Sequence, residues 1–99
     1  MTMYRTGYFV ELKAKDELLR QGAAIVVRSA RSLTPADLIA IFPDHKEIWL
    51  VQCKAKQQAP KNKKTLQRRF KDLKALEGTY ICKAVAYMKQ GKKYAFIEV

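Results

Sequence analysis

The chain has few of the residues that build metal clusters and disulfide frameworks. Its two cysteines, Cys53 and Cys82, are too far apart to form a CxxC pair, and His45 is its one histidine. These counts exclude a zinc centre of clustered cysteines and histidines, and they argue against a nuclease that relies on a histidine base with histidine metal ligands. Both thiols are expected to be buried and reduced, as in the cytosol.

Long apolar stretches are also missing. No apolar run approaches the roughly 20 residues that a bilayer-spanning helix needs. The first residues, MTMYRTGYFVELK, lack the apolar core of a secretory signal peptide. We therefore expect no membrane partner and a protein that is cytoplasmic or located wherever its binding partner is. A virus-encoded protein in a host cytoplasm is an open alternative.

Negative charge is scarce. Nine Asp and Glu stand against 20 Lys and Arg, which gives a formal net charge of +11 in 99 residues. This density favours a polyanion partner, most often nucleic acid, over a merely solvated basic surface, although net charge does not distinguish DNA from RNA. With 48% hydrophobic residues the chain can build one small core, so we expect residues 1–99 to form a single domain.

The periodicity of the apolar residues predicts an α/β fold. The expected order is a helix at 3–21, strands at 23–30, 36–42 and 47–55, a polar loop, a helix at 62–77, and strands at 79–89 and 94–99. The second and third strands are apolar on both sides, which places helices over both faces of the sheet. We therefore expect three layers, with a mixed central five-stranded β-sheet flanked by two helices.

Helical spacing also predicts which side chains are buried. In the first helix Tyr8, Leu12 and Leu19 share one face, with Phe9 and Leu18 at its margins. In the second helix the buried face is expected to comprise Leu66, Phe70, Leu73 and Leu76.

The second and third strands predict a hairpin with a defined register. If the turn centres on residues 44–45, Phe42 pairs with Glu47 and Asp37 pairs with Gln52. Directly opposed residues share a face of the sheet, so a carboxylate and an amide are neighbours at one end of an otherwise apolar hairpin.

Two further polar residues are expected at the same place. Lys54 follows Gln52 on the same face, and Glu11 lies at the margin of the apolar stripe of the first helix, where a carboxylate is costly without a cation or donor. Each position has a simpler explanation: Asp37 caps a turn, Glu11 pairs with Lys15, and the strand end frays into solvent. The convergence of all four favours a site.

These groups suit metal-assisted phosphodiester hydrolysis. Glu11 and Asp37 are hard oxygen donors for Mg²⁺ or Mn²⁺. Gln52 adds an amide oxygen or orients the attacking water, and the backbone carbonyl of Cys53 is a further candidate ligand. Lys54 can hold a hydroxide or stabilise the charge that develops on the phosphate.

The spacing Asp37-x14-Gln52-x-Lys54 resembles the PD-(D/E)XK nuclease signature. Together with RTGYFVE, VVRSARS, ADLIAIF and LVQCK, it resembles the archaeal-type Holliday junction resolvases across the whole chain. The resemblance implies a restriction-endonuclease-like fold and a homodimeric, Mg²⁺-dependent endonuclease that cuts four-way DNA junctions. It adds Ser32 to the catalytic set of Glu11, Asp37, Gln52 and Lys54, and it implies that Arg5 contacts DNA.

One residue departs from the family pattern. Gln52 stands where these resolvases usually carry Glu, and the Gln-x-Lys form resembles Mrr-type restriction endonucleases. Three readings stay open: a junction resolvase, a general or restriction-like DNA nuclease, and a DNA-binding relative with weak or no turnover. An RNA-binding basic protein is a more distant fourth, because it does not explain Glu11 or Asp37.

The basic residues are unevenly distributed, and many follow the third strand. The predicted phosphate contacts are Lys56, Lys61, Lys63, Lys64, Arg68 and Arg69, with Arg28 and Arg31 flanking the site from the other side. Two cuts in a symmetric junction require two sites, so we expect a homodimer. The terminal strands or the outer face of the second helix are candidate interfaces.

Overall fold

The computed structural model describes residues 2–29, 34–78 and 82–99, with side chains from residue 7 onward. Its elements are α1 (Thr2–Arg20), β1 (Ile25–Arg28), β2 (Leu38–Phe42), β3 (Glu47–Gln58), α2 (Lys63–Arg69), α3 (Lys71–Ala75), β4 (Cys82–Gln90) and β5 (Lys93–Glu98). No helix within these ranges is long and apolar enough to cross a membrane.

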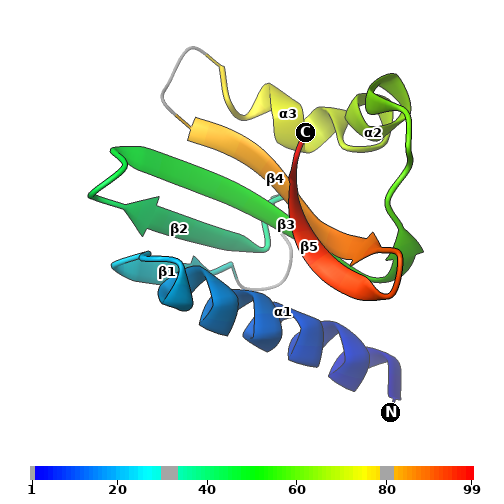
Figure 1. Ribbon diagram of the computed structural model, residues 1–99, viewed down its shortest axis with the longest axis horizontal. Helices are drawn as coiled ribbons and strands as arrows, with labels where there is room; N and C mark the ends of the chain where they lie inside the picture. The colour runs from blue at the N-terminus through cyan, green and yellow to red at the C-terminus, as the bar shows by residue number, and fades with distance from the viewer. Residues whose placement is uncertain (1, 30–33, 79–81) are drawn as a thin grey trace.

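The five strands form one mixed sheet in the order β1-β2-β3-β4-β5. All neighbours are antiparallel except β3 and β4, which are parallel and therefore need a crossover, and the chain makes it through α2 and α3. Helix α1 lies below the sheet and α2 and α3 lie above it (Figure 1). The expected three-layer α/β architecture with a mixed five-stranded sheet is confirmed, although the described residues form three helices where two were expected.

The β2–β3 hairpin has the register that its turn predicts. Phe42 pairs with Glu47 and Ile39 pairs with Leu50. The turn is tight: Lys46 has a φ of 55°, and its N–H donates to the carbonyl of Pro43 at 3.2 Å. This register determines which residues of β3 share a face with Asp37.

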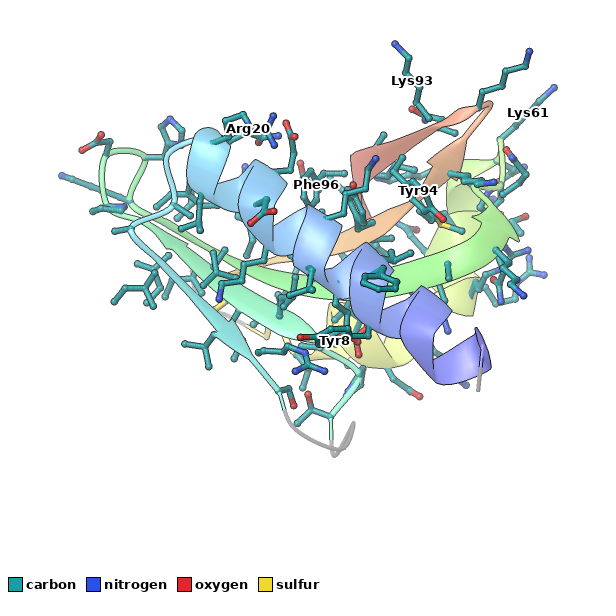
Figure 2. The ribbon with its side chains drawn as sticks, turned by 90° about the horizontal axis from the view of Figure 1, so that it is seen from below. Tyr8, Arg20, Lys61, Lys93, Tyr94 and Phe96 are labelled. Carbon is teal, nitrogen blue, oxygen red and sulfur yellow. The ribbon has the colours of Figure 1, made fainter. Side chains whose placement is uncertain are left out.

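Helix α1 is rotated from the predicted orientation. Its buried residues are Val10, Ala14 and Leu18, one row at a spacing of four, whereas Tyr8 and Phe9 are 43% and 60% exposed. The prediction was right for Leu18 but wrong for Tyr8, Phe9 and Leu19, because it gave weight to the largest apolar side chains. The small Ala14 instead lets the helix backbone approach the sheet, and α1 packs across β1, β2 and β3 (Figure 2).

The predicted second helix is broken in two. Phe70 ends α2 and precedes α3 with φ −111° and ψ 33°, while Asn62 caps the N-terminus of α2 by accepting from the N–H groups of Lys64 and Thr65. Leu66, Phe70 and Leu73 are buried as predicted, but Leu76 is 42% exposed. The last residue of α3 is Ala75, so Leu76 follows the end of the helix and does not continue the buried row.

Strand β3 is longer than predicted. The polar run that follows Ala55 reads as a loop, yet β3 continues to Gln58, with a register shift between Cys53 and Gln58. The reason is a tertiary contact: the Gln58 amide donates to the carbonyl of Gly91 at 2.8 Å and accepts from its N–H at 3.1 Å. The extension is thereby attached to the β4–β5 turn.

Candidate active site

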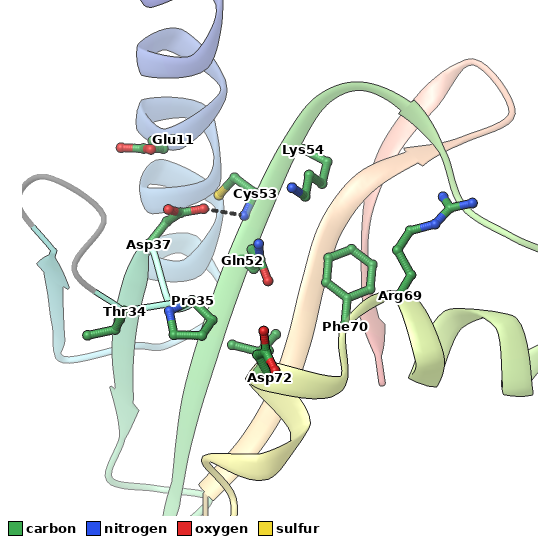
Figure 3. Close-up of a pocket in the computed structure, with 11 residues that line it drawn as sticks. Glu11, Thr34, Pro35, Asp37, Gln52, Cys53, Lys54, Arg69, Phe70 and Asp72 are labelled. Atoms are coloured by element: carbon green, nitrogen blue, oxygen red, sulfur yellow. Dashed lines mark hydrogen bonds between the residues drawn. The ribbon is translucent and has the colours of Figure 1, made fainter.

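A cavity of about 530 Å³ opens beside β3, between the start of β2 and the break that separates α2 from α3. Glu11, Asp37, Gln52 and Lys54, the four side chains singled out in the sequence, all line it (Figure 3). They come from three elements, with Glu11 on α1, Asp37 directly before β2, and Gln52 and Lys54 on β3. The structure therefore brings together the four residues that the sequence pattern predicts to converge.

The backbone of Asp37 is bonded to strands on both sides. Its N–H donates to the carbonyl of Val51 at 2.7 Å, and its carbonyl accepts from the N–H of Ser29 at 2.9 Å. Its side chain turns toward β3, where Oδ2 accepts from the N–H of Cys53 at 2.8 Å. The preceding turn is capped by Thr34, whose hydroxyl bonds the backbone of Ala36, so Asp37 does not serve as its cap.

Burial is the main influence on the charge of Asp37. Desolvation raises the pKa of this carboxyl, and the negative charge of Glu11 raises it further, while the Cys53 N–H and the positive charges of Lys54 and Arg28 only partly offset them. The net effect is a pKa above the ordinary aspartate value. The cavity thus holds a carboxylate whose ionised form would gain from a nearby cation.

Glu11 pairs with Arg28, the last residue of β1. Arg28 Nε donates to Glu11 Oε1 at 2.8 Å, and the two side chains are 50% and 21% exposed, respectively. The guanidinium also lies 4.9 Å from the ring centroid of Tyr8. The hydrogen bond to Glu11 is the largest cause that raises the pKa of Arg28. The partner of Glu11 is therefore Arg28 across the fold, not Lys15 along the helix.

The candidate metal donors are oxygen atoms. No group of three or more His, Cys, Asp and Glu side chains suited to a metal occurs among the residues that the structure describes. Two carboxylates, the Gln52 amide and the Cys53 carbonyl nevertheless fit Mg²⁺ in kind, since this ion uses one or two protein carboxylates and keeps several waters. The Cys53 thiol does not join them, because burial raises its pKa and keeps it protonated.

The far wall of the cavity contains one predicted phosphate contact, Arg69, and two residues that the sequence did not predict at the site, Phe70 and Asp72. Arg69, Phe70 and Asp72 line it, and Arg69 also donates to the carbonyl of Gln58 at 3.4 Å. Asp72 is a third carboxylate beside the cavity. No local signal could have revealed that Asp72 lies there. The apolar spacing continues regularly from Phe70 to Leu73, so it gives no sign of the break at Phe70.

The other predicted phosphate contacts are mostly exposed. Those on the extension of β3 and around α2 are Lys56, Lys61, Lys63, Lys64 and Arg68. Lys63 also donates to the backbone carbonyl of Glu98 at 2.6 Å. Arg5 lies in α1, without a described side chain, and Arg31 and Ser32 lie outside the described residues. This exposure leaves the basic side chains next to β3 accessible to a polyanion.

Comparisons of the chain with protein-family models, with characterised proteins and with solved structures give no match. A functional argument therefore depends on the geometry and chemistry of the cavity and on the charge around it.

Proposed function

We propose that this protein is a metal-dependent endodeoxyribonuclease with a restriction-endonuclease-like fold, and that its substrate is a four-way DNA junction. One observation carries the proposal: Glu11, Asp37, Gln52 and Lys54, distant in sequence, line a single cavity. Their order and spacing resemble the PD-(D/E)XK signature, and the mixed sheet between helices is compatible with that fold.

Each polar side chain has a role in this proposal. Glu11, Asp37, the Gln52 amide and the Cys53 carbonyl would hold Mg²⁺ or Mn²⁺, which supplies a Lewis acid and an activated water. The Lys54 ammonium stabilises negative charge on the phosphate oxygens as water attacks. The burial that raises the pKa of Asp37 also lowers the local dielectric, which strengthens these interactions.

The charge of the chain supports a DNA substrate bound through its backbone. The net charge is +11, and exposed lysines and arginines occur from the end of β3 into α2. Contacts of this kind position a duplex arm but carry little sequence information. Binding is therefore expected to depend on the shape of the DNA and to weaken steeply with salt.

A homodimer would supply the two active sites that a symmetric junction requires. Ile25 and Val27 of β1 are 52% and 51% exposed, and Ile41 of β2 is 37% exposed. Cross-strand pairing places Ile25 beside Ile41 and Val27 beside Ile39. We call the surface that these four side chains form the aliphatic face; it consists of Ile25, Val27, Ile39 and Ile41.

The composition of the aliphatic face supports a second copy of the chain as its partner. It carries no charge in a chain with 20 basic residues, so two copies can meet there without bringing like charges together. The register Ile39–Leu50 and Ile41–Ile48 continues the aliphatic rows onto β3, whose next residues on that face are Gln52 and Lys54. Pairing through this face would set the two cavities near each other.

A second candidate function has its own support. Gln52 contributes no negative charge, and Glu11 already pairs with Arg28 at 2.8 Å. Both features weaken the attraction for a metal ion, so the alternative is a junction-binding protein of the same fold with little or no turnover.

A cleavage assay tests the proposal. Purified protein is incubated with a labelled four-way junction and with a linear duplex of the same sequence, each with Mg²⁺, with Mn²⁺ and with chelator. We expect paired, metal-dependent cuts in the junction. The Asp37→Asn variant, which can keep the bond from Cys53 but loses the charge, should cut more than about 100-fold more slowly and bind as before. Asp16→Asn, at an exposed position on α1, is the matched control.

The outcomes separate the candidates. Equal cutting of junction and duplex would replace the resolvase by a general or restriction-like nuclease. Tight junction binding without cuts under either metal would support the second candidate. Cutting that persists in Asp37→Asn would show that the cavity is not the active site.

A further inference from the structure

A second concave surface lies on the other side of the sheet, between α1 and the β4–β5 hairpin. It encloses about 860 Å³. Helix α1 packs on β1, β2 and β3, so part of the lower face of β4 and β5 stays open beside it (Figure 2). We call this surface the aromatic groove. Its lining includes Trp49, Tyr87, Tyr94 and Phe96 together with Lys13, Lys89, Lys92 and Lys93.

The rings form a continuous cluster. Tyr87 stacks on Tyr94 with ring centroids 5.4 Å apart and an interplanar angle of 15°. The ring centroids of Tyr87 and Phe96 are 4.5 Å apart. Phe96 in turn lies edge-on to Trp49 at 5.8 Å. Tyr87 is buried, but the other three are only partly buried. The groove therefore presents partly uncovered aromatic surface at its floor.

The position of Tyr94 is set by its neighbours. Its hydroxyl donates to the carbonyl of Ala55, the residue after Lys54 on β3. The ammonium groups of Lys13 and Lys89 lie 5.7 and 5.9 Å from its ring centroid. These contacts orient the ring and place positive charge at its sides.

Positive charge dominates the rim of the groove. Lys13, Lys92 and Lys93 are exposed. The acidic residue of the lining is Glu17. Its Oε1 lies 3.6 Å from a guanidinium nitrogen of Arg20, so its negative charge is already paired. The positive charge of the rim lysines favours an anionic ligand, and the aromatic rings favour a ligand with a flat aromatic group.

We propose that the aromatic groove binds a single-stranded nucleic-acid segment, with a base stacked on the partly exposed rings and the backbone phosphates held by the rim lysines. Stacking platforms inside positively charged grooves are the common means of binding single strands without sequence preference. The proposal goes beyond cleavage, because the groove is separate from the cavity that contains Asp37 and Lys54 and does not require turnover.

Trp49 provides a direct readout, because it is the single tryptophan of the chain and lines the groove. The experiment titrates the full-length protein, in the presence of chelator, with a 12-nucleotide oligo-dT and records tryptophan fluorescence and affinity at low salt. We expect saturable quenching. An abasic backbone of the same length should bind more weakly, because it offers phosphates without bases.

Variants of the rings and of the rim test the two parts of the site. Phe96→Ala and Tyr94→Ala should each weaken oligo-dT binding roughly 5- to 150-fold, the range expected for loss of one stacked base. Tyr94→Phe keeps the ring and should bind nearly as well. The double variant Lys92→Gln/Lys93→Gln changes only exposed residues of the β4–β5 turn, so it keeps the test valid if a ring variant fails to fold.

The lysine variant has a matched control. Lys92→Gln/Lys93→Gln should weaken oligo-dT binding several-fold, with a smaller salt dependence. Lys46→Gln/Lys71→Gln removes the same charge at exposed positions outside the groove and should leave the Trp49 quenching curve unchanged.

The proposal would be overturned by no change in Trp49 fluorescence, by equal affinity for the abasic backbone, or by an equal response to polyglutamate, which would reveal an acidic-peptide site. Quenching by thymidine monophosphate at a similar concentration would indicate a free-nucleotide site in place of one for a strand. Saturable quenching in a protein that cuts no DNA would support the single-strand site in the groove and reject the nuclease proposal. DNA cutting without quenching would support the nuclease and reject the groove site.

Discussion

Arg28 donates from Nε to Oε1 of Glu11 at 2.8 Å, which joins the last residue of β1 to the middle of α1. This ion pair joins the helix to the sheet, and its Glu11 lines the candidate active site. It neutralises one of the two carboxylates expected to attract a metal ion. Arg28 therefore competes with a metal for Glu11.

Removal of that competitor is expected to tighten metal binding. Arg28→Ala should bind Mn²⁺ up to about fivefold more tightly, since a partly exposed ion pair contributes about 1 kcal/mol at most. Titration of Mn²⁺ by electron paramagnetic resonance measures the effect. Arg20→Ala, which removes an arginine next to Glu17 on the same helix, should leave the affinity unchanged. Weaker binding in Arg28→Ala would show that the guanidinium organises the site.

Gln52→Glu is expected to increase both metal affinity and cleavage. A further carboxylate on β3 adds negative charge to the cavity, so Mg²⁺ should bind about tenfold more tightly. The concentration of Mg²⁺ that gives half-maximal cleavage is the measurement. Gln57→Glu makes the same change at an exposed position of β3 that does not line the cavity. A variant no better than its parent would mean that the amide has a role that a carboxylate cannot fill.

Leu73 and Leu76 should differ sharply when each is truncated to alanine. Leu73 of α3 is fully buried, whereas Leu76 is 42% exposed. Leu73→Ala should lower the free energy of unfolding by about 2–5 kcal/mol, and Leu76→Ala by less than about 1 kcal/mol. Urea unfolding followed by circular dichroism measures both. Equal losses would indicate that α2 and α3 form the single helix that apolar spacing predicts.

Glu77 should contribute a pH-dependent part of the stability. Partial burial raises the pKa of this carboxyl, but the Ala84 N–H, at 2.6 Å from Oε2, and the nearby ammonium of Lys74 outweigh it and leave the pKa below its ordinary value. The folded state therefore binds the Glu77 proton less readily than the unfolded chain does. The stabilisation is complete at neutral pH and is lost as the pH falls below about 5.

The Glu77→Gln variant isolates this contribution. It should be less stable than the parent by about 1 kcal/mol at pH 7, with the difference shrinking toward pH 3. Free energies of unfolding from urea titrations at several pH values test this. Asp16→Asn, on the exposed side of α1, should show a much smaller effect. A difference that grows in acid would contradict the assigned sign.

A charge on the aliphatic face should prevent dimer formation. Ile41→Lys places an ammonium at a 37% exposed residue of the aliphatic face. Sedimentation equilibrium should give a dimer for the parent protein and a monomer for this variant, with an unchanged circular dichroism spectrum. Leu19→Lys, at a 43% exposed position on α1, should stay dimeric. A parent protein that sediments as a monomer would reject the interface.

The hairpin was predictable because its information is local. A tight turn sets the register, and strict alternation then places Asp37, Gln52 and Lys54 on one face. The rotation of α1 and the break at Phe70 were not predictable in this way. Both depend on how side chains from distant segments fill the space between the layers. A prediction from apolar spacing alone gives most weight to the larger residues and cannot include that packing.

The sequence by itself determined the basic charge, the order of helices and strands, the β2–β3 register and the identity of the residues that meet beside β3. These properties follow from composition and from short-range periodicity. Tertiary structure decided that Arg28 pairs with Glu11, that Asp72 and Arg69 form the far wall, and that aromatic side chains from β3, β4 and β5 share a groove with lysines of α1 and the β4–β5 turn. The physical reason is that these contacts join segments whose separation along the chain carries no periodic signal, so only the packing of the layers brings them together.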